Sequence, residues 1–567
     1  MSEAIDWDID LPTDPDEEYR ALVRALRRTQ GFGLLFVRCS PAEGTRLIQR
    51  VQTDLPQKTA AVLSFDQPIT DGNLYSRVEE YLEHTNHPNI LFIQGLEHSI
   101  YDYEDTKRRQ DNWQSPDLYS YSWKGVPRVL MNLNQQRERF RDTFNTCFVF
   151  LIPNFVLSYL ANRAPDFFDW RSGIFQLPMD AERLQQESQR VYSERFNLED
   201  YEALTSNERR QKILEVQALI DEDHQTLDCR AEPYFEQGLL FATAGKLEEA
   251  IAAFDQAVAI KPDDHDTLYN KGIALGKLER YVEAIASYDQ VIAIKPDKYE
   301  PFYNKGTALN KLRLYKEAIV AFDQSLALNP DDQIASCLFL IKGSVLRILG
   351  RDEEAITAFD QSLAVEPDDP RVFFNKGVAL RDLRRYEEAI SAFDQAIAIN
   401  LEYHEAFFIK GAVLFQLGRD EEAITAFDQA LAIKPEYPEA FFIKGMALRF
   451  VERYVEAIAA FDQALAIKPD DQDALNNKGN ALGNLGRYEE AIAAYDRALA
   501  IKPDYHNAFY NKACCYGLQK DVVKAVEFLQ QAIGLNLKYR KDAKTDSDFD
   551  GVRDDERFRA VVDTVST

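Results

Sequence analysis

The sequence predicts a mainly α-helical protein, in which an α-solenoid of about nine helix-turn-helix repeats follows an α/β domain with a parallel sheet. Two observations predict this fold class. After residue 231, a pattern of small, aromatic and proline residues recurs about every 34 residues. Before residue 180, short apolar runs of strand length alternate with amphipathic stretches of helix length, which is typical of α/β domains.

Residues 1–180 form the predicted α/β domain. Its apolar runs predict four strands, at 33–38, 60–65, 89–94 and 146–152, and its amphipathic stretches predict helices at 43–55, 73–84 and 127–143. Runs that are apolar throughout are typical of parallel strands whose two faces are both covered.

The first strand is followed by CSPAEGTR, residues 39–46, where a nucleotide-binding domain would carry its phosphate loop. A working loop reads GxxxxGK[ST], because glycine N–H groups hold phosphates, the lysine reaches the terminal ones and the hydroxyl binds magnesium. Here only Gly44, Thr45 and Arg46 occupy the end of that pattern, the lysine is absent, and Glu43 places negative charge where phosphate would lie. Gln94 stands where the third strand would carry a metal-binding aspartate.

The strand order, with the stretches 133–137 and 164–173, resembles the P-loop ATPases of the AAA and STAND type, and in particular the degenerate STAND-type modules fused to helical repeats in bacteria. The resemblance implies a catalytically inactive module without a cofactor. Glu97 is then either a relic of the catalytic base or a solvated loop carboxylate, and we expect the second. Arg171 either senses a terminal phosphate or pairs with Asp166 or Asp169, and we expect the pairing.

Residues 181–230 are rich in charged, helix-forming side chains and form a predicted helical connector. Thr205 and Glu208 have the spacing of a capping box, in which each side chain bonds the backbone N–H of the other residue. We therefore expect a helix to begin there and to dock the two domains.

The repeat is clearest in residues 473–503, DALNNKGNALGNLGRYEEAIAAYDRALAIKP. Gly479 lies in the first predicted helix, where a glycine lets the partner helix approach closely. Ala491 and Tyr495 lie four residues apart on one face of the second helix, and Pro503 ends the unit. The chemistry of this unit is packing rather than catalysis.

Equivalent residues can be followed along the chain. The small residue of the first helix recurs as Gly238, Gly272, Gly306, Gly343, Gly377, Gly411, Gly445 and Gly479, and the aromatic residue of the second helix recurs as Phe254, Tyr288, Phe322, Phe359, Phe393, Phe427, Phe461 and Tyr495. This pattern resembles the tetratricopeptide repeat over residues 231–539, which implies helix pairs stacked into one solenoid. The interval between Gly306 and Gly343 is three residues longer than the others, which predicts an insertion near residues 333–335.

Residues 540–567 follow the last repeat. The run from Asp546 to Gly551 resembles the start of a calcium loop, but Arg557 stands at its twelfth position, where calcium requires a bidentate acid. We therefore expect a polar cap on the end of the solenoid and no metal site.

Composition narrows the function. The chain has 567 residues, of which 46% are hydrophobic and 28% charged, so it is long enough for more than one domain. Its net charge of −28 argues against nucleic acid or an anionic membrane as the main partner. The six cysteines have no metal-binding spacing, and neither an apolar leader nor an apolar run of about 18 residues is present. These features predict a cytoplasmic protein with reduced thiols.

In tetratricopeptide proteins the first helices line a concave groove that holds a protein segment, so the resemblance implies a binding site there. The positions expected to face the groove supply amides, aromatic rings and arginines, together with Phe415 and Phe450. The expected groove residues are Asn270, Asn304, Arg347, Phe374, Asn375, Arg381, Phe408, Phe442, Met446, Arg449 and Asn477. The three phenylalanines at one repeat position would form a ladder, with the arginines beside it; alternatively, these rings pack against the next helix.

Two functions are compatible with the sequence. The first is a non-enzymatic scaffold, whose groove binds an extended or helical peptide with apolar side chains and at least one acid, and whose α/β module provides a second docking surface. The second is a nucleotide-dependent switch, in which the α/β module still binds ATP or GTP and controls access to the groove. The missing lysine and aspartate favour the scaffold. The sequence specifies neither the partner nor the oligomeric state.

Overall fold

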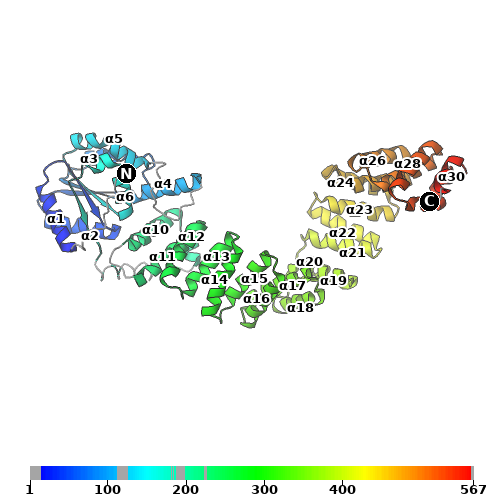
Figure 1. The fold of residues 1–567 in the computed structure, drawn as a ribbon, viewed down its shortest axis with the longest axis horizontal. Coiled ribbons are helices and arrows are strands. Elements are labelled where there is room, and N and C mark those ends of the chain that lie inside the picture. The colour runs from blue at the N-terminus through cyan, green and yellow to red at the C-terminus, as the bar shows by residue number, and fades with distance from the viewer. Residues whose placement is uncertain are drawn as a thin grey trace. The chain divides into compact units, whose positions relative to one another are not determined.

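The computed structural model describes residues 14–111, 126–179, 198–221 and 227–563, together with Glu182, Leu184 and Gln186. The chain divides into two compact units, Met1–Leu314 and Tyr315–Thr567, and each is described by itself (Figure 1). Within the described residues, no helix combines the length and the apolarity needed to cross a membrane.

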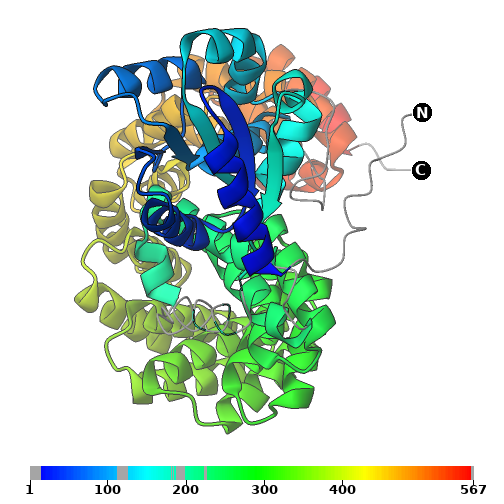
Figure 2. The same ribbon diagram turned by 90° about the vertical axis from the view of Figure 1, so that its left-hand side faces the viewer.

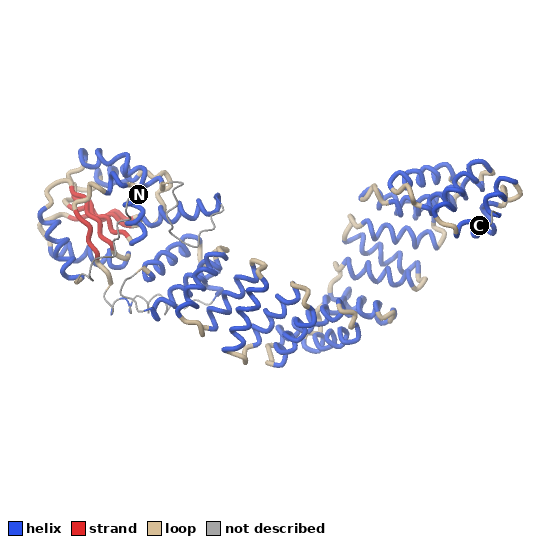
Figure 3. The backbone as a smooth tube through the Cα atoms, viewed as in Figure 1, coloured by secondary structure: helices blue, strands red, loops and turns tan. Residues whose placement is uncertain are grey.

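The first unit contains a parallel sheet whose strands are β1 (Gly33–Arg38), β2 (Ala60–Ser64), β3 (Ile90–Gln94), β4 (Cys147–Ile152) and β5 (Gly173–Gln176). Their order in the sheet is β2-β3-β4-β1-β5, drawn in red in Figure 3. The four predicted strands are confirmed to within one residue at each end. The fifth strand was not predicted, because GIFQ is short and takes its partner, β1, from far away in the sequence.

Helices cover both faces of this sheet, because alternate strand residues point to opposite sides. Leu35 and Val37 pack against α1 (Pro15–Arg28) and α2 (Pro41–Asp54). Leu34 and Phe36 lie in the core on the other side. That side is covered by α3 (Leu74–Glu83), α4 (Leu96–Asp111), α5 (Arg128–Thr143), α6 (Asn154–Arg163) and α7 (Pro165–Phe168). In Figure 2 this domain faces the viewer, with α1, β1 and α2 in dark blue.

The connector contains α9 (Leu198–Ala203) and α10 (Ser206–Ile220). The predicted capping box is confirmed: Thr205 accepts the N–H of Glu208, and the Glu208 side chain accepts the N–H of Thr205. One continuous apolar core then runs from the sheet through α10 to Tyr288 in the second repeat. The α/β domain, the connector and the first repeats therefore share a core within the first unit.

Within residues 227–563, the predicted first and second helices of the repeats are present and alternate along the chain. The first helices are α11 (Leu227–Thr243), α13 (His265–Lys277), α15 (Tyr299–Lys311), α17 (Asp332–Ile348), α19 (Pro370–Asp382), α21 (His404–Gln416), α23 (Pro438–Phe450), α25 (Gln472–Asn484) and α27 (His506–Leu518). The second helices are α12 (Leu247–Ile260), α14 (Tyr281–Ile294), α16 (Tyr315–Ala327), α18 (Asp352–Val365), α20 (Tyr386–Ile399), α22 (Asp420–Ile433), α24 (Tyr454–Ile467), α26 (Tyr488–Ile501) and α28 (Val522–Leu535).

The predicted insertion lengthens one helix. Helix α17 has 17 residues, whereas α19 has 13. Asp331 caps the longer helix by accepting the N–H of Ile334. The added residues are therefore absorbed at the start of a first helix and not in a loop.

The residues after the last repeat form α29 (Lys538–Thr545), a short 3₁₀ helix (Ser547–Phe549) and α30 (Glu556–Asp563). This cap is polar only on its outside, because Phe549, Val552 and Phe558 are buried against α27 and α28. The acids of the calcium-like run have protein partners: Asp546 accepts a 2.7 Å hydrogen bond from the Tyr510 hydroxyl, and Asp550 pairs with Arg553 at 2.6 Å.

Candidate functional site

The first helices of the second unit form one continuous face, because each of α17, α19, α21, α23 and α25 contacts the next. We call this surface the first-helix face. It carries the predicted groove residues from Arg347 to Asn477, whereas Asn270 and Asn304 lie in the first unit.

The predicted phenylalanine ladder is partly built into the packing. Phe374 is half-buried, and its ring centroid lies 5.9 Å from Phe393 in its own repeat and 5.1 Å from Tyr403 of the next repeat. Phe408 lies in the same way, 6.0 Å from Phe427 and 4.8 Å from Tyr437. Phe442 is also half-buried and lies 6.0 Å from Phe461. These rings therefore join neighbouring helices as well as facing the surface.

Two of the predicted arginines already have an acidic partner. Arg347 Nη1 lies 3.6 Å from Asp382 Oδ2, and Arg381 Nη2 lies 2.8 Å from Asp382 Oδ1. Sequence reasoning missed Asp382, although it directly follows Arg381. A partner's carboxylate would have to compete with Asp382 for both guanidinium groups.

Arg449 differs from those two arginines. Among the described residues it forms no ion pair, and its buried Nε has no hydrogen-bond partner. Its guanidinium carbon lies 4.9 Å from the ring centroid of Phe450, which is 58% exposed. The Phe450 ring in turn lies 5.6 Å from Phe415 of the preceding repeat, and the half-buried Met446 packs on the same core. We call Phe415, Arg449 and Phe450 the anchor cluster.

The predicted asparagines bond mainly to their own helices. Asn270, Asn375 and Asn477 each donate to the carbonyl oxygen four residues earlier, at 2.8–2.9 Å. Asn304 instead donates to the Tyr269 hydroxyl of the preceding repeat, at 2.9 Å. These donors are therefore engaged within the protein.

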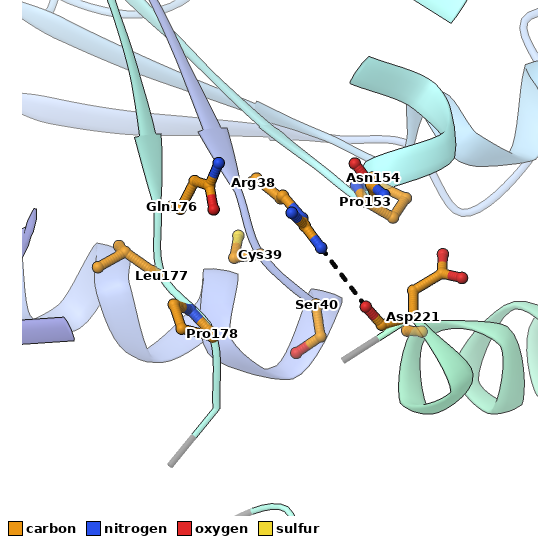
Figure 4. Close-up of a pocket in the computed structure, with 10 residues that line it drawn as sticks. Arg38, Cys39, Ser40, Pro153, Asn154, Gln176, Leu177, Pro178 and Asp221 are labelled. Carbon is orange, nitrogen blue, oxygen red and sulfur yellow. Dashed lines mark hydrogen bonds between the residues drawn. The ribbon is translucent and has the colours of Figure 1, made fainter. Parts of the chain in front are cut away.

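A second candidate site lies in the first unit, at the carboxyl ends of β1 to β4. The chain crosses from β4 past β1 to β5, and open parallel sheets bind ligands at such switch points. A cavity of about 200 Å³ lies there. It is lined by residues at or just after the ends of three strands, and by one residue of α10: Ser40, Gly44 and Thr45 after β1, Asp66 after β2, Gln94 at the end of β3, Glu97 and His98 after β3, and Gln211. A smaller neighbouring pocket contains Arg38, whose Nη2 donates to the Asp221 carbonyl at 3.5 Å (Figure 4).

Glu97 lies in the first turn of α4 and is only 6% exposed. The prediction of a solvated loop carboxylate is therefore wrong, because the ends of β2 and β3 and the helix itself enclose the side chain. Burial raises the pKa of Glu97 to about 7, although the N–H groups of Glu97 and Gly95 oppose the shift. Its Oε2 is buried without a hydrogen-bond partner.

The residues predicted to occupy the end of a phosphate-loop pattern, Gly44, Thr45 and Arg46, lie in the first turns of α2, and the side chains of this segment bond locally. Ser40 caps the helix by accepting the N–H of Glu43, and Thr45 donates to the carbonyl of Pro41 at 3.2 Å. Arg46 pairs with Glu43 at 3.1 Å and does not line the cavity.

Arg171 does not line the cavity either. Its Nη1 lies 3.4 Å from Asp169 Oδ1, which confirms one of the two predicted pairings, and its guanidinium stacks over Phe168. Asp166 instead lies 3.8 Å from Arg137.

Comparison with protein families identifies the repeats. Three family models, each described as tetratricopeptide repeat, match the chain: the first at 235–299, 269–333, 342–400 and 374–438, the second at 473–505, and the third at 438–471 and 506–539. The chain is a tetratricopeptide repeat protein over residues 235–539. This family implies protein–protein interaction, and its matches leave the family of the α/β domain open.

Several solved structures are similar to part of this chain. YrrB, titled a TPR protein with an unusual peptide-binding site, is 23% identical over 34% of this chain and 97% of its own, with a TM-score of 0.31. A tetratricopeptide repeat protein from Parabacteroides merdae is 17% identical, over 42% and 93%, with a TM-score of 0.33. MamA from Desulfovibrio magneticus is 20% identical, over 31% and 98%, with a TM-score of 0.29. No curated protein matches the chain.

Proposed function

We propose that the protein is a non-enzymatic scaffold, in which the first-helix face binds a partner segment carrying an apolar side chain next to an acid. The anchor cluster carries this proposal. It combines an exposed phenylalanine, Phe450, with Arg449, an arginine for which the described residues supply no counter-ion.

The chemistry of the anchor cluster suits such a segment. Aromatic and arginine side chains are the types most often found at interface hot spots, where truncation costs roughly 2 kcal/mol or more. A guanidinium binds a carboxylate through two parallel hydrogen bonds. The Phe415 and Phe450 rings would cover an apolar side chain beside that carboxylate.

We also propose that the α/β domain acts as a second docking surface and is not an ATPase. Contacts within the first unit attach it firmly to the repeats. Lys246, at the start of α12, pairs with Asp105 of α4 and donates to the Tyr101 hydroxyl at 3.3 Å. Arg210 of α10 also pairs with α4: its Nη2 lies 3.2 Å from Asp102 Oδ1.

The nucleotide-dependent switch is supported by one observation. Helix α4 carries Glu97, a residue of the cavity wall, in its first turn and contacts the first repeat through Tyr101 and Asp105. Binding of a nucleotide in the cavity could therefore be transmitted through this helix to the repeats. However, none of the described residues that line the cavity is a lysine or an arginine. A phosphate would therefore find no counter-charge there, and we favour the scaffold.

The test begins with co-purification of the full chain from its host cells and identification of the bound protein. Affinity for that partner is then measured for Phe450→Ala and Arg449→Ala. Each change should weaken binding by about 30-fold or more, which corresponds to roughly 2 kcal/mol.

The matched control is Val455→Ala, an apolar residue on α24 that is 67% exposed but lies outside the first-helix face. It should leave the affinity unchanged. If both anchor variants bind as tightly as the parent, the first-helix face is not the binding site.

A further inference from the structure

The cavity at the carboxyl edge of the sheet has an acidic character that the scaffold function does not use. We propose that it binds a small organic cation, an ammonium or guanidinium compound, and not a phosphate-bearing nucleotide.

The charges of the lining disfavour an anion. The ionisable carboxyl groups on its wall are Asp66 and Glu97, with no lysine or arginine among the described lining residues. The N-terminus of α2, which could otherwise attract phosphate, is capped by Ser40. Arg46, at the end of the phosphate-loop pattern, pairs with Glu43. A cation is therefore the charged ligand that this wall can stabilise.

The wall also contains buried side-chain atoms without a hydrogen-bond partner. Glu97 Oε2 is buried without a partner, which costs free energy that a donor from a ligand would recover. His98 Nδ1 is likewise buried without a partner, and burial lowers the pKa of His98, which favours the neutral ring. The Gln94 side chain donates to Ser64 Oγ at 2.7 Å, which leaves its carbonyl oxygen as an acceptor. A ligand rich in N–H donors fits this set.

The volume limits the ligand. About 200 Å³ is below the roughly 300–1,000 Å³ of pockets that hold drug-sized molecules. At the wall of the cavity, the backbone of Gly95 approaches that of Phe65 closely. Gly95 has a φ of +91°, and an added Cβ would lie 1.9 Å from the Phe65 carbonyl oxygen. A simple amine or guanidine is therefore a better match than a nucleotide.

A bare metal ion is a poorer match. The two groups of described residues that bring three ligand atoms close enough for a metal are Asp264, His265 and Asp266, and Cys514, Asp546 and Asp548. Neither group includes Asp66, Glu97 or His98. The residues of the cavity therefore do not form such a group.

Binding should depend on pH. Glu97 must lose its proton to pair with a cation, and burial raises its pKa to about 7. The other groups that face this region are Asp66 after β2, Cys39 after β1, and His98 of α4, with the charge of Arg210 on α10 acting on His98. Between pH 6 and pH 8 the ionised fraction of Glu97 rises about tenfold.

The experiment is calorimetric titration of the full chain with methylguanidine, propylamine and ATP plus magnesium, at pH 6 and pH 8. The two cations should bind, and their affinity at pH 8 should be about tenfold higher than at pH 6. Glu97→Gln should weaken cation binding at pH 8 at least tenfold and should abolish its pH dependence.

The matched control is Glu83→Gln, an exposed carboxylate at the end of α3, which should change nothing. Circular dichroism of both variants checks the fold. Three results would overturn the proposal: no heat of binding from either cation at 10 mM, cation binding unaffected by Glu97→Gln, or ATP binding tighter than both cations.

Discussion

At the residue scale, Glu97 shows how position determines chemistry. A carboxyl group near the start of a helix is ordinarily stabilised as a carboxylate by the helix dipole. Here burial outweighs the helix N–H groups and raises its pKa from 4.5 to about 7. The folded protein is therefore more stable when the Glu97 carboxyl group is protonated than when it is ionised.

The sign of the resulting pH dependence follows from linkage. Because the pKa in the folded state is the higher one, the stabilisation is complete below about pH 4.5 and is lost as the pH rises through 7. Glu97→Gln, which mimics the neutral acid, should match the parent at pH 4.5 and be more stable at pH 8. The upper limit of the gain is about 3 kcal/mol.

Urea unfolding followed by tryptophan fluorescence measures this difference. All four tryptophans, Trp7, Trp113, Trp123 and Trp170, precede residue 180, so the signal reports the α/β domain. Equal stability of parent and variant at pH 8 would show that Glu97 ionises without cost. In that case the burial of the carboxyl group would not control its protonation.

At the scale of the element, the repeat is held by the contact between its glycine and its aromatic residue. A Cβ built on Gly377 would lie 2.7 Å from Cε1 of Phe393, and the equivalent glycines of six other repeats meet their aromatic rings at 2.4–2.8 Å. Successive repeats are further joined by ion pairs such as Lys376–Asp360, at 2.5 Å. The longer α17 keeps this ion pair as Lys342–Asp323, also at 2.5 Å.

We predict that Gly377→Ala destabilises the array by about 1–3 kcal/mol, because the added methyl group overpacks the helix pair. The overpacking outweighs the gain of up to about 1 kcal/mol that alanine gives in a helix. Urea unfolding followed by circular dichroism measures the change.

Gly534→Ala is the matched control for this substitution. Gly534 lies in α28, and an added Cβ there would meet nothing within 4 Å, so this change should leave stability equal or raised. If both substitutions stabilise the array to the same extent, the close approach at Gly377 does not limit packing.

At the scale of the whole molecule, the first unit does not end where the repeats begin. The C-terminal half of helix α10 is buried nearly all round, including Ile213, Leu214, Val216 and Leu219, because it lies in the core that joins the sheet to the first repeat. Because each repeat buries its apolar face against its neighbours, the repeat pattern alone would favour independent folding of a fragment that begins at Ala231. That fragment would begin inside α11 and lack α10.

We therefore predict that residues 231–567 are less soluble than residues 331–567, which begin at the N-cap of α17 and lie entirely in the second unit. Size-exclusion chromatography and thermal unfolding by circular dichroism compare the two. The longer fragment should aggregate or unfold over a broad range, and the shorter one should be monodisperse and cooperative. If both fragments are equally well behaved, the first repeat does not need α10 as its cover.

The sequence by itself determined what depends on local or evenly spaced contacts. The alternating helices of the repeats, the glycine beside its aromatic ring, the capping box at Thr205 and four of the five strands follow from residues that interact within one element or at a fixed repeat spacing. The absence of a GxxxxGK[ST] motif after the first strand is equally visible in the sequence, because such a motif is short and continuous.

Only the tertiary structure decided the burial of Glu97, the pairing of Arg347 and Arg381 with Asp382, the fifth strand and the core shared by the sheet and the first repeats. Each depends on residues brought together from different elements. Such neighbours determine how far a side chain is solvated, and therefore whether an acid is charged and whether an arginine is free to bind a partner. A periodic sequence pattern does not specify these neighbours.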